Sequence, residues 1–402
     1  MNATASKRIR ESFIGPIDCR RLPLAPQAAR CDDAATEDAT MTDLAAFARA
    51  HIAPRDLLAS AALPPGLWEA MAASGLFRIG LPAEHGGDGG SYADIAAAER
   101  VLVEEGGSTG LAGIWGSHQM VPRWFLVGFG TPAQQARWLP GFASGALTAG
   151  VAISEPKVGA HPKLLSTTAT RDGEDWVLDG EKSYVTNGNL AGLYMVLAIT
   201  AMQGERKRYS FFLVPRDTPG LEVMEAETPP SMWPVGHVAL RLKGCRVPAE
   251  ALVGPQDGAY EAIALPFRDA EDAIGTSSQA GNLPGIVRLL AAELPSPAPE
   301  EAVAELGALS GLAALVAPAA AVLARAVDDR AWDGPAAQAL LIGLRQHAAH
   351  FHTRAAAFRE AYAARRDAKL DARLHSIQTS LSVARGPRAI RMARLGAQMM
   401  PK

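Results

Sequence analysis

Cysteine is scarce in this chain of 402 residues, which carries only Cys19, Cys31 and Cys245, with no C-x-x-C spacing among them. An odd and sparse set argues against a disulfide framework and indicates a reducing compartment, so we expect a cytoplasmic protein. Lysine and arginine form no block, and the formal net charge is only -3. Nucleic acid is therefore not an expected partner.

Long apolar runs are rare as well. The N-terminus carries Lys7, Arg8 and Arg10, but no apolar run long enough for the core of a signal peptide follows them. Residues 306–324 are uncharged and almost long enough to cross a bilayer, but they are mostly Ala and Gly and include Pro318. This composition transfers weakly into lipid, so we expect a helix buried in a bundle and no membrane span.

Several common catalytic signatures are missing. The Gly-rich run at residues 86–90 lacks the Lys and the preceding strand of a phosphate-binding loop, and no G-x-S-x-G elbow occurs. His347, His350 and His352 lie close together on one predicted helix, whereas the other histidines are scattered. A packed or solvated helix face explains the three better than a metal site does, so we expect no metal.

What the chain does have is a β-rich stretch at residues 150–189. Residues 151–154 are small or β-branched, which predicts a strand that ends at Pro156 and Gly159. The overall content of hydrophobic residues, 48%, is ordinary for a globular protein and sufficient for a sizeable core.

The second half of this stretch is predicted to be a hairpin. Residues 176–178 and 182–186 have strand composition, and Asp179-Gly180 between them suits a type I′ turn, where both residues need positive φ. A further turn is expected at Asn187-Gly188, a second pair of the same kind.

Two motifs in this stretch resemble those of the acyl-CoA dehydrogenase family. That family carries a [T/S]-E-P-x-x-G-S segment and, further along, a W-I-T-N-G segment. Here residues 154–160 read S-E-P-K-V-G-A, and residues 184–188 read Y-V-T-N-G. Two motifs in the same order and at a similar spacing are far more specific than either alone.

The resemblance extends over residues 41–395, and it is strong as far as Gly254 and weaker after it. Residues 80–87 are similar to the family's G-L-x-x-P-E-E-Y-G-G turn, residues 130–145 to its G-T-x-x-Q-x-x-x-L-P…G segment, and residues 247–254 to its V-P-x-x-x-L-[L/V]-G segment. Thr131 is the expected N-cap of a helix with Pro132 at its first position.

Apolar spacing places helices on both sides of the β-rich stretch. We expect helices over residues 41–53, 65–73, 92–105, 109–125, 131–140, 300–327, 334–364 and 370–395. Further strands are expected over residues 194–199, 209–214, 221–224 and 238–242, with turns that include Pro229-Pro230. Pro295 to Pro299 should separate two helices.

The resemblance implies an α+β fold of the acyl-CoA dehydrogenase type. It consists of an N-terminal helical domain, a central β-barrel-like domain and a C-terminal helical bundle. We place an N-terminal extension at residues 1–40 and the three domains at residues 41–147, 148–255 and 256–402.

The resemblance also implies FAD as cofactor, held against the β-domain. Family members remove a proton from Cα of an acyl thioester with a carboxylate while hydride passes from Cβ to flavin N5. Tyr184 takes the place of the Trp that stacks on the flavin, and Thr186 takes the place of the Thr near N5. The implied cofactor-binding residues are Ile153, Ser154, Gly159, Tyr184, Val185 and Thr186.

The acyl pocket of the family is lined by the helix that corresponds to residues 109–125. The implied substrate contacts are Ala112, Trp115, Gly116 and His118 on this helix, with Ala160 and Arg268 elsewhere. A packed helix with a core Trp and an incidental His is an equally good interpretation.

The catalytic base is expected on the helix that follows the β-domain, as in a minority of the family. Glu271 is the candidate base, Asp272 is the second choice, and Arg268 would orient substrate or pair with Glu271. Burial would raise the pKa of such a carboxylate toward working pH. An ordinary surface ion pair between Arg268 and Glu271, at i and i+3, is the alternative.

Three features depart from the family pattern. Ala160-His161 stand where the family has Ser-Asp, so the thioester carrier stays open between CoA and an acyl carrier protein. An R-x-x-F-G segment is absent from the region after Val287. Gly396 to Gln398 stand where a Q-x-x-G-G motif would begin, and no Y-E-G-T segment supplies the usual Glu before Lys402. We therefore expect a divergent member with a shortened C-terminus.

The resemblance further implies partners. A separate electron acceptor such as an electron-transfer flavoprotein is expected, as is a homo-dimer or tetramer, possibly a hetero-oligomer. Two alternatives stay open: a non-catalytic family member that serves as a partner subunit, and a flavin monooxygenase or oxidase on the same scaffold.

Overall fold

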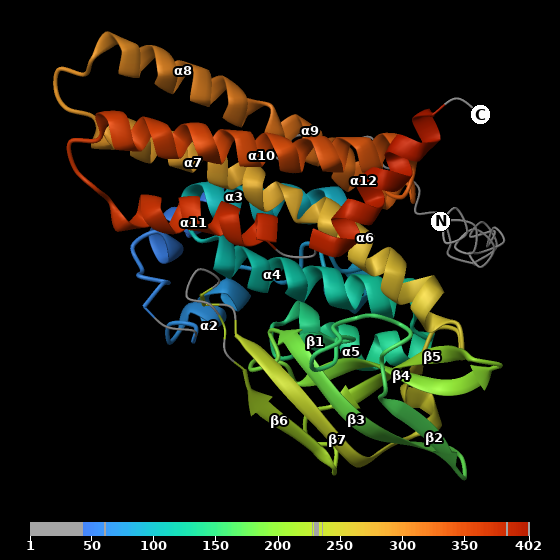
Figure 1. Cartoon of the computed structure of the whole chain (residues 1–402). Helices are drawn as coiled ribbons and strands as arrows, with labels where there is room; N and C mark the ends of the chain where they lie inside the picture. The colour runs from blue at the N-terminus through green and yellow to red at the C-terminus, as the bar shows by residue number, and fades with distance from the viewer. Residues whose placement is uncertain are drawn as a thin grey trace, which may run out of the picture.

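The computed structural model describes residues 43–59, 62–226, 228, 233–234, 236–382 and 385–400. The predicted extension at residues 1–40 lies outside these residues, as do Cys19, Cys31 and the predicted turn at Pro229-Pro230. Helices come first, a β-sheet follows, and a long helical region ends the chain (Figure 1). This confirms the predicted α+β architecture, whereas the domain boundaries stay a prediction.

The helices of the N-terminal region pack against one side of the sheet. Its elements are η2 (Ala48–Ile52), α2 (Leu67–Ala73), η3 (Ala83–His85), α3 (Tyr92–Gly106), α4 (Thr109–Pro122), η4 (Arg123–Val127) and α5 (Pro132–Ala143). Capping boxes begin two of them: Ser91 and Asp94 at α3, and Thr131 and Gln134 at α5. Each box satisfies backbone N–H groups that a helix start leaves unpaired, which confirms Thr131 as an N-cap.

The sheet has eight strands. They are β1 (Ala149–Ala152), β2 (Thr168–Asp172), β3 (Asp175–Thr186), β4 (Leu193–Gln203), β5 (Arg206–Pro215), β6 (Leu221–Glu225), β7 (His237–Val247) and β8 (Leu252–Val253). Their order is β6-β7-β3-β2-β4-β5-β8, and β1 pairs with β4 in parallel. The 3-10 turn η6 (Ala249–Ala251) precedes the last strand.

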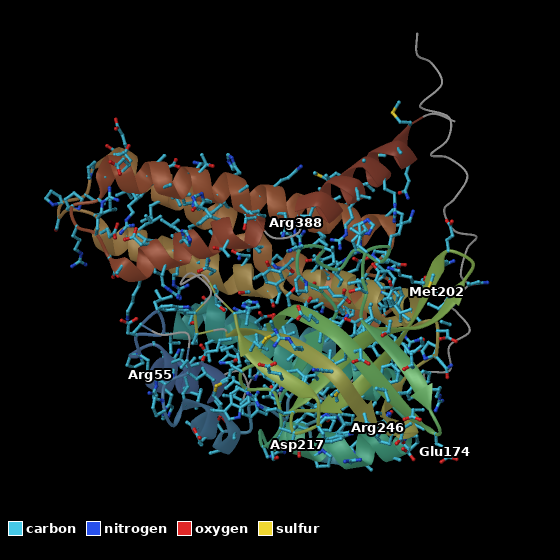
Figure 2. All side chains as sticks on the ribbon, turned by 60° about the horizontal axis from the view of Figure 1, so that its bottom comes forward. Arg55, Glu174, Met202, Asp217, Arg246 and Arg388 are labelled. Carbon is cyan, nitrogen blue, oxygen red and sulfur yellow. The ribbon has the colours of Figure 1, made fainter. Side chains whose placement is uncertain are left out.

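The predicted hairpin at Asp179-Gly180 is wrong. One strand, β3, runs through both residues, and its register against β7 shifts between Leu178 and Gly180. Gly180 has a φ of 147°, and a Cβ there would lie 2.5 Å from the Thr167 hydroxyl, so the pair forms a β-bulge. The hairpin turn lies at Gly173-Glu174 instead, with Glu174 at the edge of the sheet away from the helices (Figure 2).

Strands β4 and β5 are buried on both faces. One face belongs to the core of the sheet, and the other packs against the helices. Alternation places Tyr194 and Val196 in the core of the sheet, and Met195 and Leu197 in a second core shared with the helices. The same alternation recurs in β5. The side of the sheet that faces the helices is therefore fixed by packing.

The C-terminal region is helical, as predicted. It comprises η7 (Tyr260–Ala264), α6 (Leu265–Ile274), α7 (Thr276–Glu293), α8 (Glu300–Ala314), α9 (Val316–Asp328), α10 (Pro335–Tyr362), α11 (Ala368–Ser382) and α12 (Arg385–Met399). The predicted helix over residues 300–327 is divided in two at Leu315. Asp328 at the end of α9 accepts from the N–H groups of Tyr92 (2.9 Å) and Ala93 (3.0 Å), which ties the bundle to the start of α3.

The apolar segment around Pro318 is only partly buried. Glu300–Asp328, taken as one helical stretch, is long and apolar enough to cross a membrane by length and composition, with a mean hydropathy of 2.0. Only 28% of its most apolar window is buried, so the prediction of a buried helix is wrong for most of it. Neighbouring helices cover one face, and α8 lies at the outer edge of the bundle (Figure 1). A single such helix is weak support for a membrane span.

Candidate functional site

The two sequence motifs lie side by side in the sheet. The Ser183 N–H donates to the Ser154 carbonyl at 2.8 Å, and the Lys182 ammonium donates to the Ile153 carbonyl at 3.2 Å. Among the described residues, no hydrogen bond engages the hydroxyl of the half-buried Ser154. These contacts bring residues 154–160 and 182–188 together, although the hairpin expected between them does not exist.

A buried ion pair beneath this junction holds it in place. The Lys182 ammonium lies 3.0 Å from Glu155 Oε1, and Glu155 also accepts from Ser166 and Thr167. Burial acts to raise the pKa of Glu155, but Lys182 and these hydrogen bonds lower it to about 2. Burial lowers the pKa of Lys182 to about 8, against the attraction of Glu155. Both groups are therefore charged at neutral pH.

Gly159 closes the turn of the first motif. Its N–H and carbonyl exchange two 3.0 Å hydrogen bonds with Glu155, and its φ is 58°. A left-handed residue is needed at that point, which favours glycine. Ala160 next to it is exposed, and its carbonyl accepts from the Tyr260 hydroxyl at 3.3 Å.

The second motif presents its side chains in different directions. A register shift between Lys182 and Val185 puts Tyr184 at a φ of 56° with 68% of its side chain exposed. Val185 is fully buried in the core of the sheet, so only its backbone can contact a ligand. Thr186 is half-buried, with its hydroxyl 3.3 Å from His237 Nε2.

His237 is a neighbour that sequence reasoning did not connect with the site. Its Nδ1 lies 3.3 Å from the Thr228 hydroxyl, and burial lowers its pKa. The pairing of β3 with β7 brings it next to Thr186. No local pattern signals this, since the two residues are far apart in the chain.

The predicted pocket residues of α4 are all buried. Trp115 donates from Nε1 to the Leu76 carbonyl at 2.8 Å, and Ala112 is 1% exposed. His118 lies among the rings of Trp68, Phe77 and Phe142, and its Nε2 is 3.0 Å from the Phe142 carbonyl. These surroundings match the packed-helix interpretation of Trp115 and His118.

Burial also determines the charge of His118. Its pKa is lowered to about 4, because desolvation outweighs the hydrogen bond to Phe142. The ring is therefore neutral at physiological pH and unsuited to bind an anionic group by charge.

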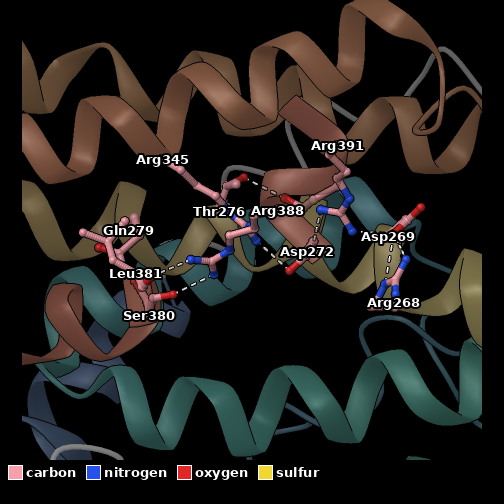
Figure 3. Close-up of polar contacts among 11 residues, drawn as sticks. Arg268, Asp269, Asp272, Thr276, Gln279, Arg345, Ser380, Leu381, Arg388 and Arg391 are labelled. Atoms are coloured by element: carbon pink, nitrogen blue, oxygen red, sulfur yellow. Dashed lines mark hydrogen bonds and ion pairs between the residues drawn. The ribbon is translucent and has the colours of Figure 1, made fainter. Parts of the chain in front are cut away.

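The acidic residues of α6 have distinct surroundings (Figure 3). Arg268 pairs with Asp269 at 3.2 Å, not with Glu271. Asp272 accepts from Arg345 of α10 and Arg391 of α12, both at 2.6 Å and one on each carboxylate oxygen. With both oxygens engaged, Asp272 is a tether between helices rather than a free base.

Glu271 has none of these restraints. Among the described residues it makes no hydrogen bond and no ion pair, and its side chain is exposed. Burial by the surrounding protein, together with the charge of Asp272, still raises its pKa to about 7. A carboxylate whose pKa lies near the working pH suits a general base.

Glu99 on α3 is a further carboxyl group that sequence reasoning missed. It is 5% exposed, and its Oε2 accepts from the Ser277 hydroxyl at 2.7 Å. Burial raises its pKa to about 7, with the Ser277 bond opposing and the charge of Glu271 adding to the shift. A signal was present, since Glu99 lies at helical spacing from Ile95 and Leu102 on the predicted apolar face.

The N-terminal helical region and the β-sheet region each match a domain of a known protein family. Residues 34–146 match the acyl-CoA dehydrogenase N-terminal domain, and residues 150–245 match the acyl-CoA dehydrogenase middle domain. Together these matches cover more than half of the chain.

Individual relatives agree with this result. The chain is 31% identical over 194 residues to the acyl-CoA dehydrogenase FadE12 of Mycobacterium tuberculosis, covering 48% of this chain and 49% of that protein. It is 32% identical over 211 residues to the human mitochondrial short-chain specific acyl-CoA dehydrogenase, covering 52% and 50%. The chain thus spans about half the length of the curated relatives it matches.

Solved structures resemble the whole fold. A butyryl-CoA dehydrogenase from Megasphaera elsdenii superposes with a TM-score of 0.78 at 17% identity, covering 93% of this chain and all of the other. The prolyl acyl carrier protein oxidase AnaB superposes with a TM-score of 0.79 at 19% identity, covering 91% and 99%. At such identities the likeness shows the fold.

Proposed function

Because this chain belongs to the acyl-CoA dehydrogenase family, we propose that it is an FAD-dependent oxidoreductase that removes the α and β hydrogens of an acyl thioester. The observation that carries this proposal is Glu271, an accessible carboxyl group with a pKa near 7 and no partner among the described residues. FAD, when bound, would supply the acceptor for the hydride. The residues of the chain must bind it, orient the thioester and take the Cα proton.

The two motifs, near the ends of β1 and β3, offer groups that fit a flavin. The exposed ring of Tyr184 can stack on an aromatic face, and the hydroxyls of Ser154 and Thr186 can donate to or accept from its polar edge. Ile153 packs against the core beside them, and Val185 would contribute backbone groups only. Gly159 would act by keeping the turn of the first motif closed.

Glu271 is the better base of the two α6 candidates. A general base needs a free oxygen and a pKa near the working pH. Both oxygens of Asp272 accept from arginines, whereas Glu271 has neither hydrogen bond nor ion pair among the described residues. Arg268, paired with Asp269 and partly exposed, can still contact a substrate at the same helix face.

The proposal includes the carrier of the acyl group, the electron acceptor, the oligomeric assembly and the cellular location. Ala160 offers no hydroxyl to a pantetheine arm, so CoA and an acyl carrier protein are both retained as carriers. A separate acceptor such as an electron-transfer flavoprotein would take the electrons in the cytoplasm. The apolar side chains of Val303, Leu315 and Val322, each more than half exposed, favour assembly into a dimer or tetramer.

Anaerobic reduction of the flavin tests the activity. The purified chain, loaded with FAD, should bleach when an acyl-CoA or an acyl carrier protein thioester is added. Glu271→Gln should bind FAD equally well and slow bleaching by about 100-fold or more, the range for loss of a general base. Glu261→Gln is a matched control, because Glu261 lies on the preceding η7 and pairs with Arg206 at 2.6 Å.

Three other results of these experiments would contradict the proposal or favour one of its alternatives. A chain that takes up no FAD would contradict the enzyme proposal and favour a non-catalytic partner subunit. Rapid reoxidation of the bleached flavin by oxygen would favour an oxidase or monooxygenase. Unchanged bleaching by Glu271→Gln would remove Glu271 as base.

A further inference from the structure

Helices α8 and α9 carry an apolar face on each of two opposite sides. The inner face is buried against other helices at Ala302, Leu309, Ala313, Val316, Ala320, Leu323 and Val327. The opposite face is exposed, in keeping with the place of α8 at the outer edge of the bundle (Figure 1). A helix that is apolar on both sides needs a second surface to cover the outer one.

The outer face follows a regular repeat. Its residues recur at alternating intervals of three and four, and all of them are exposed: Glu301, Ala304, Ala308, Gly311, Leu315, Pro318, Val322 and Arg325. We call these residues the outer seam. The spacing keeps them in line along a helix and is typical of a face that packs against another helix. At Leu315, where α8 passes into α9, the backbone stays helical (φ −71°, ψ −22°), so the seam continues across both helices.

Charge is confined to the two ends of the outer seam. Residues 306–324 carry no charged side chain, whereas Glu301 begins the seam and Arg325 ends it. Neither of these two makes an ion pair with the described residues. They lie equally far from Ala313, which marks the midpoint of the seam. Two antiparallel copies would therefore place each Glu301 opposite the Arg325 of the other copy.

The apolar positions of the outer seam match in size in the same arrangement. Gly311 and Leu315 lie equally far from the midpoint, as do Ala304 and Val322. Leu315 and Val322 are each more than half exposed, and a Cβ built on Gly311 meets nothing within 4 Å. A large side chain would thus face a small residue in both pairs, as a knob faces a hole.

We infer that the outer seam packs against the outer seam of a second copy of this chain, antiparallel, with the two-fold axis at the level of Ala313. The inference rests on the proposed function in one respect, because it specifies the assembly named there. It requires neither FAD nor Glu271.

Other charged groups near the ends leave the seam clear. Glu305 pairs with Arg354 of α10 at 2.7 Å, and Asp328 accepts from the N–H groups at the start of α3. Glu300 is exposed next to Glu301 and adds to the negative end.

A lipid surface fits this face less well than a second copy does. Helices that lie on anionic membranes carry Lys and Arg along their polar side, whereas residues 300–324 contain three Glu and neither Lys nor Arg. The inner face is already part of the core of the bundle, and it would be uncovered if the segment entered a bilayer.

Reversing the end charges tests the antiparallel pairing. Sedimentation equilibrium of the full chain at low salt measures the dissociation constant for self-association. Glu301→Arg and Arg325→Glu each place like charges opposite each other twice in one interface, so each should weaken association by about 10-fold. The double variant restores opposite charges and should return to within about 3-fold of wild type. Effects that add instead of cancelling would contradict the pairing of these two residues.

A matched control and a central substitution complete this series. Glu174→Arg makes the same change of net charge at the edge of the sheet away from the helices, and should change the dissociation constant by less than about 2-fold (Figure 2). Leu315→Glu would bury an unpaired charge at the middle of the seam, and should weaken association by about 100-fold or more. Circular dichroism should show that this exposed substitution leaves the chain folded.

Disulfide cross-linking tests the register. Ala304→Cys and Val322→Cys are made separately in a chain with Cys19→Ser and Cys31→Ser; Cys245 is buried. An equimolar mixture should cross-link, since a disulfide needs Cα atoms within about 7 Å. Neither variant should cross-link with itself, because equivalent positions lie about 27 Å apart along the axis at a rise of 1.5 Å per residue.

Several results would overturn the inference. They are a wild type that stays monomeric, self-association that no seam substitution changes, and cross-linking of each cysteine variant with itself. A monomeric chain that floats with phosphatidylcholine vesicles, and no longer does so as Leu315→Glu, would assign the face to lipid and overturn the inference as well.

The inference and the proposed activity fail separately. Weakened association of Leu315→Glu, together with a wild type that takes up no FAD, would keep the seam and reject the activity. Bleaching by an acyl thioester, together with an assembly that the seam substitutions leave unchanged, would keep the activity and reject the seam.

Discussion

Tyr184 shows at the scale of one residue how stability and function oppose each other. A non-glycine residue at a φ of 56° is strained, and an aromatic ring with 68% exposure gains little from burial. Neither feature helps the chain to fold. Stacking of the ring on FAD, as proposed above, would account for its position beside Ser154.

Replacing Tyr184 by glycine should therefore separate the two properties. Tyr184→Gly relieves the left-handed strain and should leave the free energy of unfolding unchanged or raise it by up to about 1 kcal/mol. Loss of the ring should weaken FAD binding by about 10-fold, the worth of one aromatic contact. Urea unfolding of the flavin-free chain and a fluorescence titration with FAD measure the two effects.

Tyr184→Trp is the control for this substitution. It keeps a stacking ring and the same strain, so FAD affinity should be close to that of the wild type. Equal FAD affinity for Tyr184→Gly and wild type would show that the ring does not contact the flavin.

At the residue scale, the two motifs are visible in the sequence, whereas the surroundings of the Glu271 and Glu99 carboxyl groups are not. Glu271 was selected by its place in the family pattern, and its free carboxyl group and raised pKa became visible only in the fold. Glu99 was passed over because Ser277 and Gly116, which surround it, come from other helices. Contacts between distant segments are the information that local spacing lacks.

At the scale of elements, strand β3 explains why the hairpin prediction failed. An Asp-Gly pair signals a residue that tolerates positive φ, and both a type I′ turn and a β-bulge meet that need. Pairing with β7 on one side and β2 on the other stabilises a continuous strand. The helices were predicted better, because a repeat of 3.6 residues and capping residues such as Thr131 are local signals.

Helix α12 depends on one arginine for its attachment to α6. Arg391 donates to Asp269 at 2.5 Å and to Asp272 at 2.6 Å, and its side chain is only 12% exposed (Figure 3). Ile390 and Met392 beside it are exposed and add little packing. The ion pairs therefore link α12 to α6, while Arg388 ties the start of α12 to the carbonyls of Leu381 and Ser380 at the end of α11.

Arg391→Met should release α12 from α6. We expect faster amide hydrogen exchange and faster proteolytic cleavage within residues 385–399, with little change in the exchange of α3 or the sheet. The exposed Arg394 on the same helix provides a matched control, since Arg394→Met removes a charge that makes no ion pair with the described residues. Equal exchange in the two variants would show that the Arg391 contacts do not hold the helix.

At the scale of the whole molecule, the order of helices and sheet was predictable and the exposed surface was not. Periodicity and two motifs sufficed for the α+β architecture, because they are properties of single segments. The exposure of Val303, Leu315 and Val322 depends on which neighbouring helices cover α8 and α9. The exposed face on which the proposed assembly rests is therefore not encoded in any one segment.

The buried charges together predict how stability of the whole chain varies with pH. Glu155 has its pKa lowered from 4.5 to about 2, so its contribution is present above about pH 4.5 and is lost as pH falls toward 2. Glu99 and Glu271, with pKa values raised to about 7, contribute stability that is lost as pH rises from 4.5 toward 7. Taken alone, these three groups give the highest stability near pH 4.5, whereas His118, whose pKa burial lowers from 6.5 to about 4, loses stability as pH falls through the same range.

Glu155→Gln tests the acid side of this profile. The substitution leaves Lys182 buried without its partner, so the free energy of unfolding at pH 7 should fall by about 3–5 kcal/mol, the cost of breaking a buried pair. It should also flatten the decline between pH 4.5 and pH 2, because a neutral amide cannot take up the proton. Glu181→Gln breaks an exposed pair with Arg241 one residue before Lys182 and should change stability by less than about 1 kcal/mol. An acid limb as steep in Glu155→Gln as in wild type would mean that other carboxylates cause it, and that the Lys182 pair joins the two motifs without controlling acid stability.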